Sequence, residues 1–246
     1  MLEQMKRTYS SVQAVLGGVS RVIWPWYLVA VAGQVATGHY EYGAVGVARI
    51  TPFTYAVVLV HTVAILLAWN VMHRYLIAGG AADAIQQFRT ALAFALAQIR
   101  NLIVLMLISL IVIIPLAFLF MDEALSMSPE DAERFNRQLS LTSLPVIVLF
   151  FARLLLVAPL AARNEEQPVR RSWRATRGHF IRINILQIGC LLPLVAVSLL
   201  ADGLGQLSDG WPVIVVSALL TSAGALYSLM LYTQLAEDEY KRLMLT

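Results

Sequence analysis

The apolar positions of this chain come in long blocks, and between the blocks lie short polar links. Predominantly apolar runs of roughly 20 residues, the length that crosses a hydrocarbon core about 30 Å thick, recur along the sequence. We expect membrane spans at about 22–36, 52–78, 102–121, 144–162, 183–200 and 212–235. The pattern therefore predicts an all-α, polytopic membrane protein with six transmembrane helices in a single domain, residues 1–246.

Three further stretches precede alternate spans and have a mixed polar and apolar character. Apolar residues recur at helical spacing in 1–20 and 81–100, and 163–182 is basic with a tryptophan. Helices of this kind lie in the membrane interface, and we expect the first to end at Gly17 and Gly18. Each stretch leads into its span at an arginine, and the spacings are 79 and 82 residues: Arg21, Arg100 and Arg182. The sequence thus predicts three units, each an interfacial helix followed by a transmembrane hairpin.

Positive charges divide unequally between the two sides that this topology defines. Fourteen of the eighteen Lys and Arg residues fall on the side of both termini, three fall on the other side, and Arg153 falls within a span. Because Lys and Arg are retained on the cytoplasmic face, both termini should be cytoplasmic and the acidic linker 122–140 external. No cleaved signal peptide is expected, since no uninterrupted apolar run precedes the first span.

The composition of the chain excludes several classes of protein, partner and metal site. The chain is 59% hydrophobic and 13% charged, whereas charged residues make up about a quarter of soluble domains. A net charge of +3 is too small to suggest a nucleic-acid partner. The single cysteine, Cys190, excludes an intramolecular disulfide and a thiolate metal cluster. We expect no metal and no cofactor.

The basic stretch 163–182 is the first candidate site, because it holds six of the eighteen Lys and Arg residues. A helix that starts at Pro168 and continues to residue 182 would lie on the membrane, anchored by Trp173 and Phe180. Three of its arginines would share one face and bind anionic lipid together with Trp173: Arg170, Arg174 and Arg177. The alternative is purely topological, with the arginines holding the loop inside and binding nothing.

Arg153 is the second candidate, since it lies near the middle of the expected span 144–162. An arginine there costs about 2.5 to 3.5 kcal/mol on insertion scales, and no expected span contains an acidic residue to pair with it. One interpretation is an anion or head-group site inside the bundle. The other is that Arg153 snorkels or caps an interrupted helix. His61, also within a span, is expected to be a hydrogen-bonded bundle residue and not a metal ligand.

Residues 150–185 also resemble a known family, the membrane domain fused to some bacterial glycerophosphodiester phosphodiesterases and its stand-alone six-span relatives. The resemblance is carried by an arginine within a span, a proline near its end and a Ser-Trp-x-x-Thr-x-Gly box: Arg153, Leu154, Pro159, Pro168, Arg171, Ser172, Trp173, Thr176, Arg177, Gly178 and Phe180. It implies the inner membrane of a bacterium. In members with phosphodiesterase activity a large catalytic domain follows the last span, whereas here eleven residues follow it, so we expect no phosphodiesterase activity.

The leading functional hypothesis is a non-enzymatic bacterial inner-membrane protein with a lipid- or envelope-related role. Its expected partners are membrane lipids, anionic ones in particular, a second copy of itself or other membrane proteins. The alternative is a small transporter or flippase-like carrier of an anionic lipid or metabolite, with Arg153 in its path. A membrane-embedded enzyme is the least favoured, because no catalytic triad, paired carboxylates or metal-ligand spacing occurs in or beside the spans.

Overall fold

The structure, a computed structural model, describes residues 1–42, 52–78, 92–101, 103–104, 107, 110–111, 114–115, 152–205 and 210–245. Every regular element in these ranges is an α-helix, which confirms the predicted all-α class. A helix satisfies all its backbone hydrogen bonds internally, as an apolar segment in lipid requires. The labelled helices are α1 (Leu2–Tyr42), α2 (Pro52–Ala78), α6 (Val157–Ala162), α7 (Pro168–Ala175), α8 (Phe180–Gly205) and α9 (Trp211–Met244).

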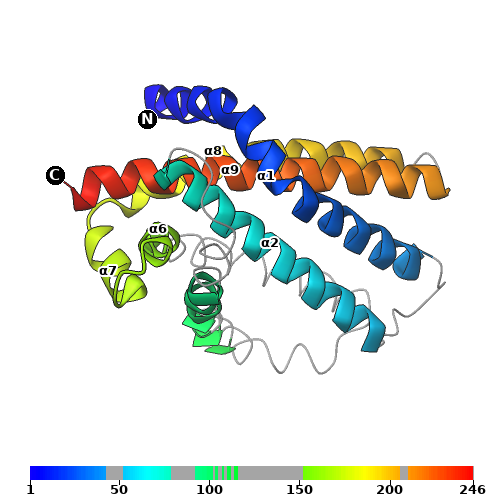
Figure 1. The fold of residues 1–246 in the computed structure, drawn as a ribbon, viewed down its shortest axis with the longest axis horizontal. Helices are drawn as coiled ribbons and strands as arrows, with labels where there is room; N and C mark the ends of the chain where they lie inside the picture. The colour runs from blue at the N-terminus through cyan, green and yellow to red at the C-terminus, as the bar shows by residue number, and fades with distance from the viewer. Residues whose placement is uncertain are drawn as a thin grey trace.

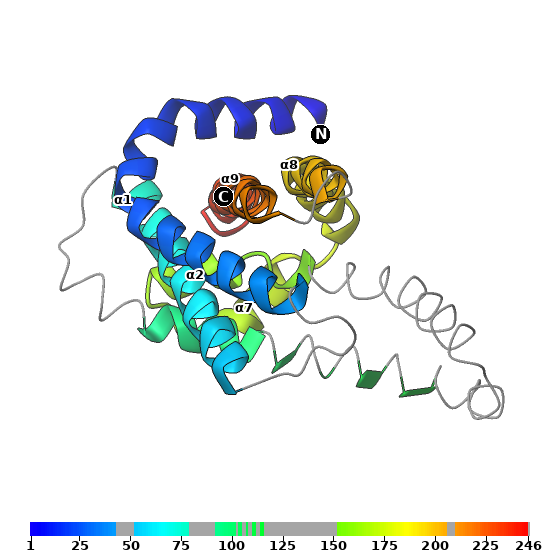
Figure 2. The same ribbon diagram turned by 90° about the vertical axis from the view of Figure 1, so that its right-hand side faces the viewer.

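Helix α9 is the centre of the bundle. It runs antiparallel to α8 along most of its length and also contacts α1, α2 and α6, while α1 and α2 form a second antiparallel pair (Figures 1 and 2). The core between these helices is apolar and closely packed, and Leu231 and Leu235 of α9 are fully buried in it. A shorter helical segment, 92–101, packs against α6 through Phe94 and Ala97.

Three of the described helices are long and apolar enough to cross a membrane by length and composition: Leu2–Gly33, Phe180–Ala201 and Trp211–Met244. Large apolar side chains point outward along them; on α8, Leu192, Leu199 and Leu200 are each more than half exposed. Exposed rows of this kind are typical of a surface that faces lipid or a partner. The expected span 102–121 lies largely outside the described residues, and the linker 122–140 lies wholly outside them. Of the expected span 144–162 the structure describes residues 152–162, in which a turn at 154–156 interrupts the helix. Six spans and three repeated units therefore stay predictions.

Helix α1 differs from its prediction, because it continues without a break through Gly17, Gly18 and Pro25 to Tyr42. The interfacial helix and the first span are thus one bent helix, whose first part lies across the rest of the bundle (Figure 2). Glycine within a helix costs about 1 kcal/mol but does not end it when packing compensates. At Gly18 the compensation is a close approach to α2, since a Cβ there would collide with the Tyr75 hydroxyl.

The predicted interfacial helix 168–182 is also different in length. Helix α7 ends at Ala175, residues 176–179 form a turn, and α8 begins at Phe180. Gly178 adopts a φ of 85°, a left-handed conformation that glycine adopts readily and that commonly ends helices. The chain therefore changes direction between the basic helix and the start of α8.

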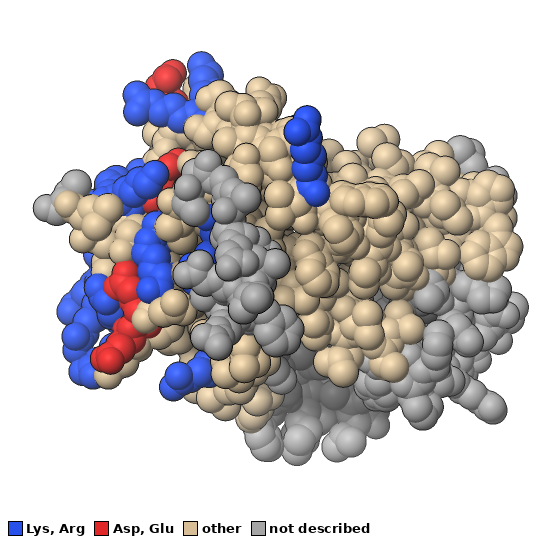
Figure 3. Space-filling view, viewed as in Figure 1, with Lys and Arg blue, Asp and Glu red and all other residues tan. Residues whose placement is uncertain are grey.

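Charged side chains gather at one end of the molecule. On the face drawn in Figure 3, the Lys, Arg, Asp and Glu residues cluster over the end where α7 and the carboxyl end of α9 lie, while most of the remaining described surface is uncharged. A body with an apolar flank and one charged end has the shape expected of a protein whose charged end projects into water.

Candidate functional site

The helix that contains Arg153 is interrupted, and a serine from α7 bridges the interruption. Residues 152–153 are helical, 154–156 form a turn, and α6 starts at Val157. The Leu156 N–H donates a hydrogen bond to the Ser172 hydroxyl oxygen at 3.1 Å, and the same hydroxyl donates to the Arg153 carbonyl oxygen at 2.7 Å. An unpaired buried backbone group costs about 1 to 3 kcal/mol. The Ser172 hydroxyl therefore provides hydrogen-bond partners for backbone groups on both sides of the interruption in the helix.

The Arg153 side chain lies between two aromatic rings. Its guanidinium carbon is 5.6 Å from the ring centroids of both Trp173 and Phe180, a cation–π geometry worth about 0.5 to 2 kcal/mol per ring. Its Nη1 atom is buried and has no hydrogen-bond partner among the described residues. Because Phe180 is the first residue of α8, Arg153 lies near the end of the bundle at which α8 begins.

Two buried carboxylates at the end of α9 hold this end of the molecule together. The Glu237 side chain is 3% exposed and accepts hydrogen bonds from Arg163 Nη2 at 2.6 Å and Nη1 at 3.1 Å. Its Oε1 atom is also 2.9 Å from Nδ1 of His73, on α2. Burial alone would raise the pKa of Glu237, but the hydrogen bonds from His73 and Arg163 outweigh burial and hold that pKa below its ordinary value. These hydrogen bonds therefore favour the ionised form of Glu237.

Glu239 has a fully buried side chain and a similar set of partners. Its carboxylate accepts hydrogen bonds from Arg182 at 2.9 Å, from Arg242 at 2.7 Å and from the Gln4 side-chain amide at 2.6 Å. Burial opposes ionisation, but the hydrogen bonds from Arg242 and Gln4 and the charge of Arg182 lower the pKa of Glu239 overall. We call these two glutamates and their hydrogen-bond partners the carboxylate layer.

The carboxylate layer joins segments that are far apart in the sequence. Through Gln4, His73, Arg163 and Arg182 it ties α9 to the start of α1, the end of α2, the link after α6 and the start of α8. Sequence reasoning missed it. The available signal was the acidic run at residues 237–239, which directly follows an apolar run on the side where most positive charges gather.

The structure divides the six arginines of the basic stretch into two sets. Arg163, Arg171 and Arg182 form ion pairs with Glu237, Glu165 and Glu239 respectively. The other three have no carboxylate within ion-pair distance among the described residues, and they are the three that the sequence pattern placed on one face: Arg170, Arg174 and Arg177. Three of the six arginines are thus neutralised within the fold, and for the other three the described residues provide no ion-pair partner.

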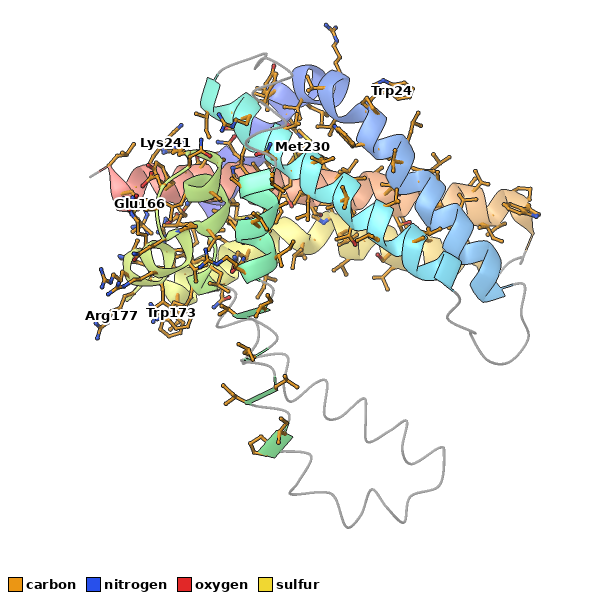
Figure 4. All side chains as sticks on the ribbon, turned by 60° about the horizontal axis from the view of Figure 1, so that its bottom comes forward. Trp24, Glu166, Trp173, Arg177, Met230 and Lys241 are labelled. Carbon is orange, nitrogen blue, oxygen red and sulfur yellow. The ribbon has the colours of Figure 1, made fainter. Side chains whose placement is uncertain are left out.

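Two of these arginines face a cleft of about 680 Å³ between α7 and the helical segment 92–101. Its described lining residues combine arginines and a tryptophan with apolar side chains, and none of them is acidic: Ala97, Arg100, Val104, Gln167, Pro168, Val169, Arg170, Trp173 and Arg174. Arg177 lies past the end of α7 and does not line the cleft; in Figure 4 it points outward from the same corner as Trp173. Of the predicted site residues, the structure thus brings Arg170, Trp173 and Arg174 together with Arg100.

His61 is another residue that the sequence singled out, and it has a structural role. His61 Nδ1 lies 3.2 Å from the Ala30 carbonyl oxygen, so His61 is a hydrogen-bonded bundle residue, as predicted. Within the part of the chain that the structure describes, no group of three or more His, Cys, Asp or Glu residues could hold a metal ion.

The described residues therefore define an all-helical protein with three helices suited to crossing a membrane and an arginine-lined cleft at its charged end. Comparison of the chain with protein-family models, curated proteins and solved structures finds no match. The resemblance noted for residues 150–185 stays a hypothesis, and the function has to be argued from the site itself.

Proposed function

We propose that this chain is a six-span protein of the bacterial inner membrane, with both termini in the cytoplasm, that binds anionic lipid without catalysing a reaction. The orientation is supported by the distribution of Lys and Arg residues, of which fourteen lie on the side of the two termini and three on the opposite side. The outward-facing apolar residues of α8 and the gathering of charge at one end support the membrane setting (Figure 3).

The observation that carries the proposal is the set of arginines without carboxylate partners beside Trp173. A guanidinium group binds phosphate oxygens through two parallel hydrogen bonds, and each basic residue near an anionic membrane surface contributes about 1 kcal/mol. Arg170 and Arg174 lie on α7 at the charged end, with Trp173 between them in sequence and 37% exposed. Tryptophan is enriched at the depth of lipid head groups. Arg163, Arg171 and Arg182 serve a different purpose, because glutamates already neutralise them.

Hydrogen exchange in nanodiscs tests the lipid-binding proposal. Exchange across residues 168–182 should be slower in anionic than in zwitterionic bilayers, and the slowing should fade with added salt because the attraction is electrostatic. The Arg170→Gln, Arg174→Gln double variant should lose most of the slowing. Arg171→Gln is the matched control, since it removes a neighbouring charge that Glu165 already pairs. Equal exchange of the wild type in both bilayers would leave the arginines with a topological role alone.

Cysteine accessibility tests the six-span topology. In a Cys190→Ala background, Glu166→Cys and Ser128→Cys should react with a membrane-impermeant reagent from opposite sides. Glu166 is exposed at the charged end (Figure 4), whereas Ser128 belongs to the linker that the charge pattern predicts to be external. Labelling of both positions from the same side would contradict six spans.

The alternative function is a carrier of an anionic lipid or metabolite. The observation that favours it is the buried Nη1 atom of Arg153, which has no hydrogen-bond partner among the described residues and lies behind Trp173, a lining residue of the cleft. Transbilayer movement of a fluorescent anionic lipid in proteoliposomes distinguishes the two functions. The carrier function predicts that the lipid crosses the bilayer faster than in protein-free liposomes. Arg153→Gln should abolish this faster movement, and Arg177→Gln should preserve it.

A further inference from the structure

The cleft differs from a basic surface because its lining combines two sets of side chains, which we call its polar half and its apolar half. Arg100, Arg170, Arg174 and Gln167 supply hydrogen-bond donors, while Ala97, Val104, Pro168 and Val169 supply apolar contacts. We propose that the cleft is a binding site for one molecule of an anionic glycerophospholipid. The phosphate lies among the three arginines, and the upper part of an acyl chain lies against the apolar residues. This inference rests on the proposed function and makes it specific to one site.

The polar half is suited to a phosphate group. Among the described residues, three guanidinium groups line it, no carboxylate does, and none of the three arginines has an acidic partner. The bond from Arg170 Nη1 to the Gln167 side-chain oxygen is long, at 3.4 Å, so Arg170 retains most of its donors for a ligand. Bidentate arginine contacts are the usual means by which proteins hold phosphate oxygens.

The apolar half favours a lipid over a free phosphate. Val104 and Val169 pack on a buried cluster formed by the helical segment 92–101 and α6, in which Phe94 and Val157 are fully buried. The apolar lining of the cleft therefore packs directly against the hydrophobic core at this end of the molecule. A volume of about 680 Å³ lies within the range of small-molecule sites, about 300 to 1,000 Å³. An inorganic phosphate ion would leave the apolar half uncovered.

The site needs two segments that are distant in the sequence. Arg100 and Arg170 are 70 residues apart and come together only in the folded chain. Trp173 lines the cleft, and its ring centroid lies 5.6 Å from the guanidinium carbon of Arg153. This cation–π contact helps to hold the Trp173 ring in place. A site of this kind should bind one lipid with saturation, whereas electrostatic attraction of α7 alone would recruit any number of anionic lipids.

Native mass spectrometry of the full-length protein in mild detergent tests the site. Titration with phosphatidylglycerol should saturate at one retained lipid per chain, and phosphatidylcholine should not be retained. Arg100→Gln should weaken retention about tenfold or more, and Val104→Trp, which fills the apolar half without changing charge, should do the same. Arg177→Gln is the control; it removes an equal charge outside the cleft and should change retention less than twofold. Arg100→Lys, with charge but no planar pair of donors, should recover only part of the affinity.

The outcomes separate the site from the wider proposal. Retention unaffected by Arg100→Gln and Val104→Trp would overturn the site, while slowed exchange of 168–182 in anionic nanodiscs would still support surface binding. A second outcome would overturn the lipid assignment in favour of a soluble phosphate ligand. In that outcome millimolar glycerol 3-phosphate or inorganic phosphate displaces the retained lipid and binds the lipid-free protein with the same affinity as the lipid. Thermal unfolding of each variant in the same detergent checks that it is folded, and Val104→Ala replaces Val104→Trp if the larger side chain prevents folding.

Discussion

The Nη2 atom of Arg163 lies 2.6 Å from Oε2 of Glu237, and the two residues are 74 positions apart. The Arg163 guanidinium carbon also lies 4.0 Å from the ring centroid of Tyr240, whose hydroxyl donates to Glu165 at 2.7 Å. These contacts hold the link between α6 and α7 against the end of α9. The position of α7, and hence of the arginine-lined cleft, therefore depends on the carboxylate layer.

Removing the Glu237 charge should destabilise the protein. Glu237→Gln leaves Arg163 and His73 without their carboxylate, and breaking one partner of a buried ion pair costs about 3 to 5 kcal/mol. We expect about 3 kcal/mol, the lower end of that range, because the Arg163 side chain is 21% exposed. Denaturant unfolding in mild detergent measures the loss. Glu3→Gln is the control, since the Glu3–Lys6 pair is highly exposed and should matter by less than about 0.5 kcal/mol. Equal effects of the two substitutions would contradict a structural role for the layer.

The carboxylate layer also predicts a dependence of stability on acid pH. The pKa values of Glu237 and Glu239 lie below their ordinary value of 4.5 in the folded protein. The stability that these groups contribute is therefore present above about pH 4.5 and is lost as the pH falls through their lower, folded values. Asp238, whose pKa burial raises, acts in the opposite direction. Unfolding midpoints measured from pH 7 to pH 3 should fall at the acid end. The Glu237→Gln, Glu239→Gln double variant should be less stable at pH 7 and lose less on acidification.

Ser172→Ala should weaken the junction between α6 and α7. The substitution leaves the Leu156 N–H and the Arg153 carbonyl without the hydroxyl that bonds to both, and a buried unpaired polar group costs about 1 to 3 kcal/mol. Hydrogen exchange at residues 154–160 should accelerate along with the loss of stability. Ser10→Ala is the matched control, because its exposed hydroxyl bonds only to the Arg7 carbonyl on the same helix. If Ser172→Ala behaves like this control, the serine does not stabilise the helix break.

Two adjacent glycines of α1 should respond oppositely to alanine. Nothing lies within 4 Å of a Cβ at position 17, so Gly17→Ala should stabilise the helix by about 0.5 to 1 kcal/mol. A Cβ at position 18 collides with Tyr75, so Gly18→Ala should destabilise by about 1 to 3 kcal/mol. Tyr75→Phe, which removes the colliding hydroxyl, should recover part of that loss. Thermal unfolding of the single and double variants measures the coupling, and equal responses at positions 17 and 18 would refute the close approach.

The sequence by itself determined the helical class and the placement of several helices. The predicted second span, 52–78, coincides with α2 (Pro52–Ala78), and the last two predicted spans fall within α8 and α9. These features are local, because a long apolar run with few charges forms a helix whatever its neighbours. The spacing also singled out Arg170, Arg174 and Arg177, which have no carboxylate within ion-pair distance among the described residues, although Arg177 lies past the end of α7.

Only the tertiary structure decided what each charged residue does. Arg163 and Arg182 resemble Arg170 and Arg174 in the sequence, yet their glutamate partners are 74 and 57 residues away. Ser172 bridges a helix break 16 to 19 residues earlier, and Arg100 reaches the cleft from a separate helical segment. Pairings of this kind follow from how packed helices align their side chains across the bundle. Local periodicity carries no information on them, because it describes one helix at a time.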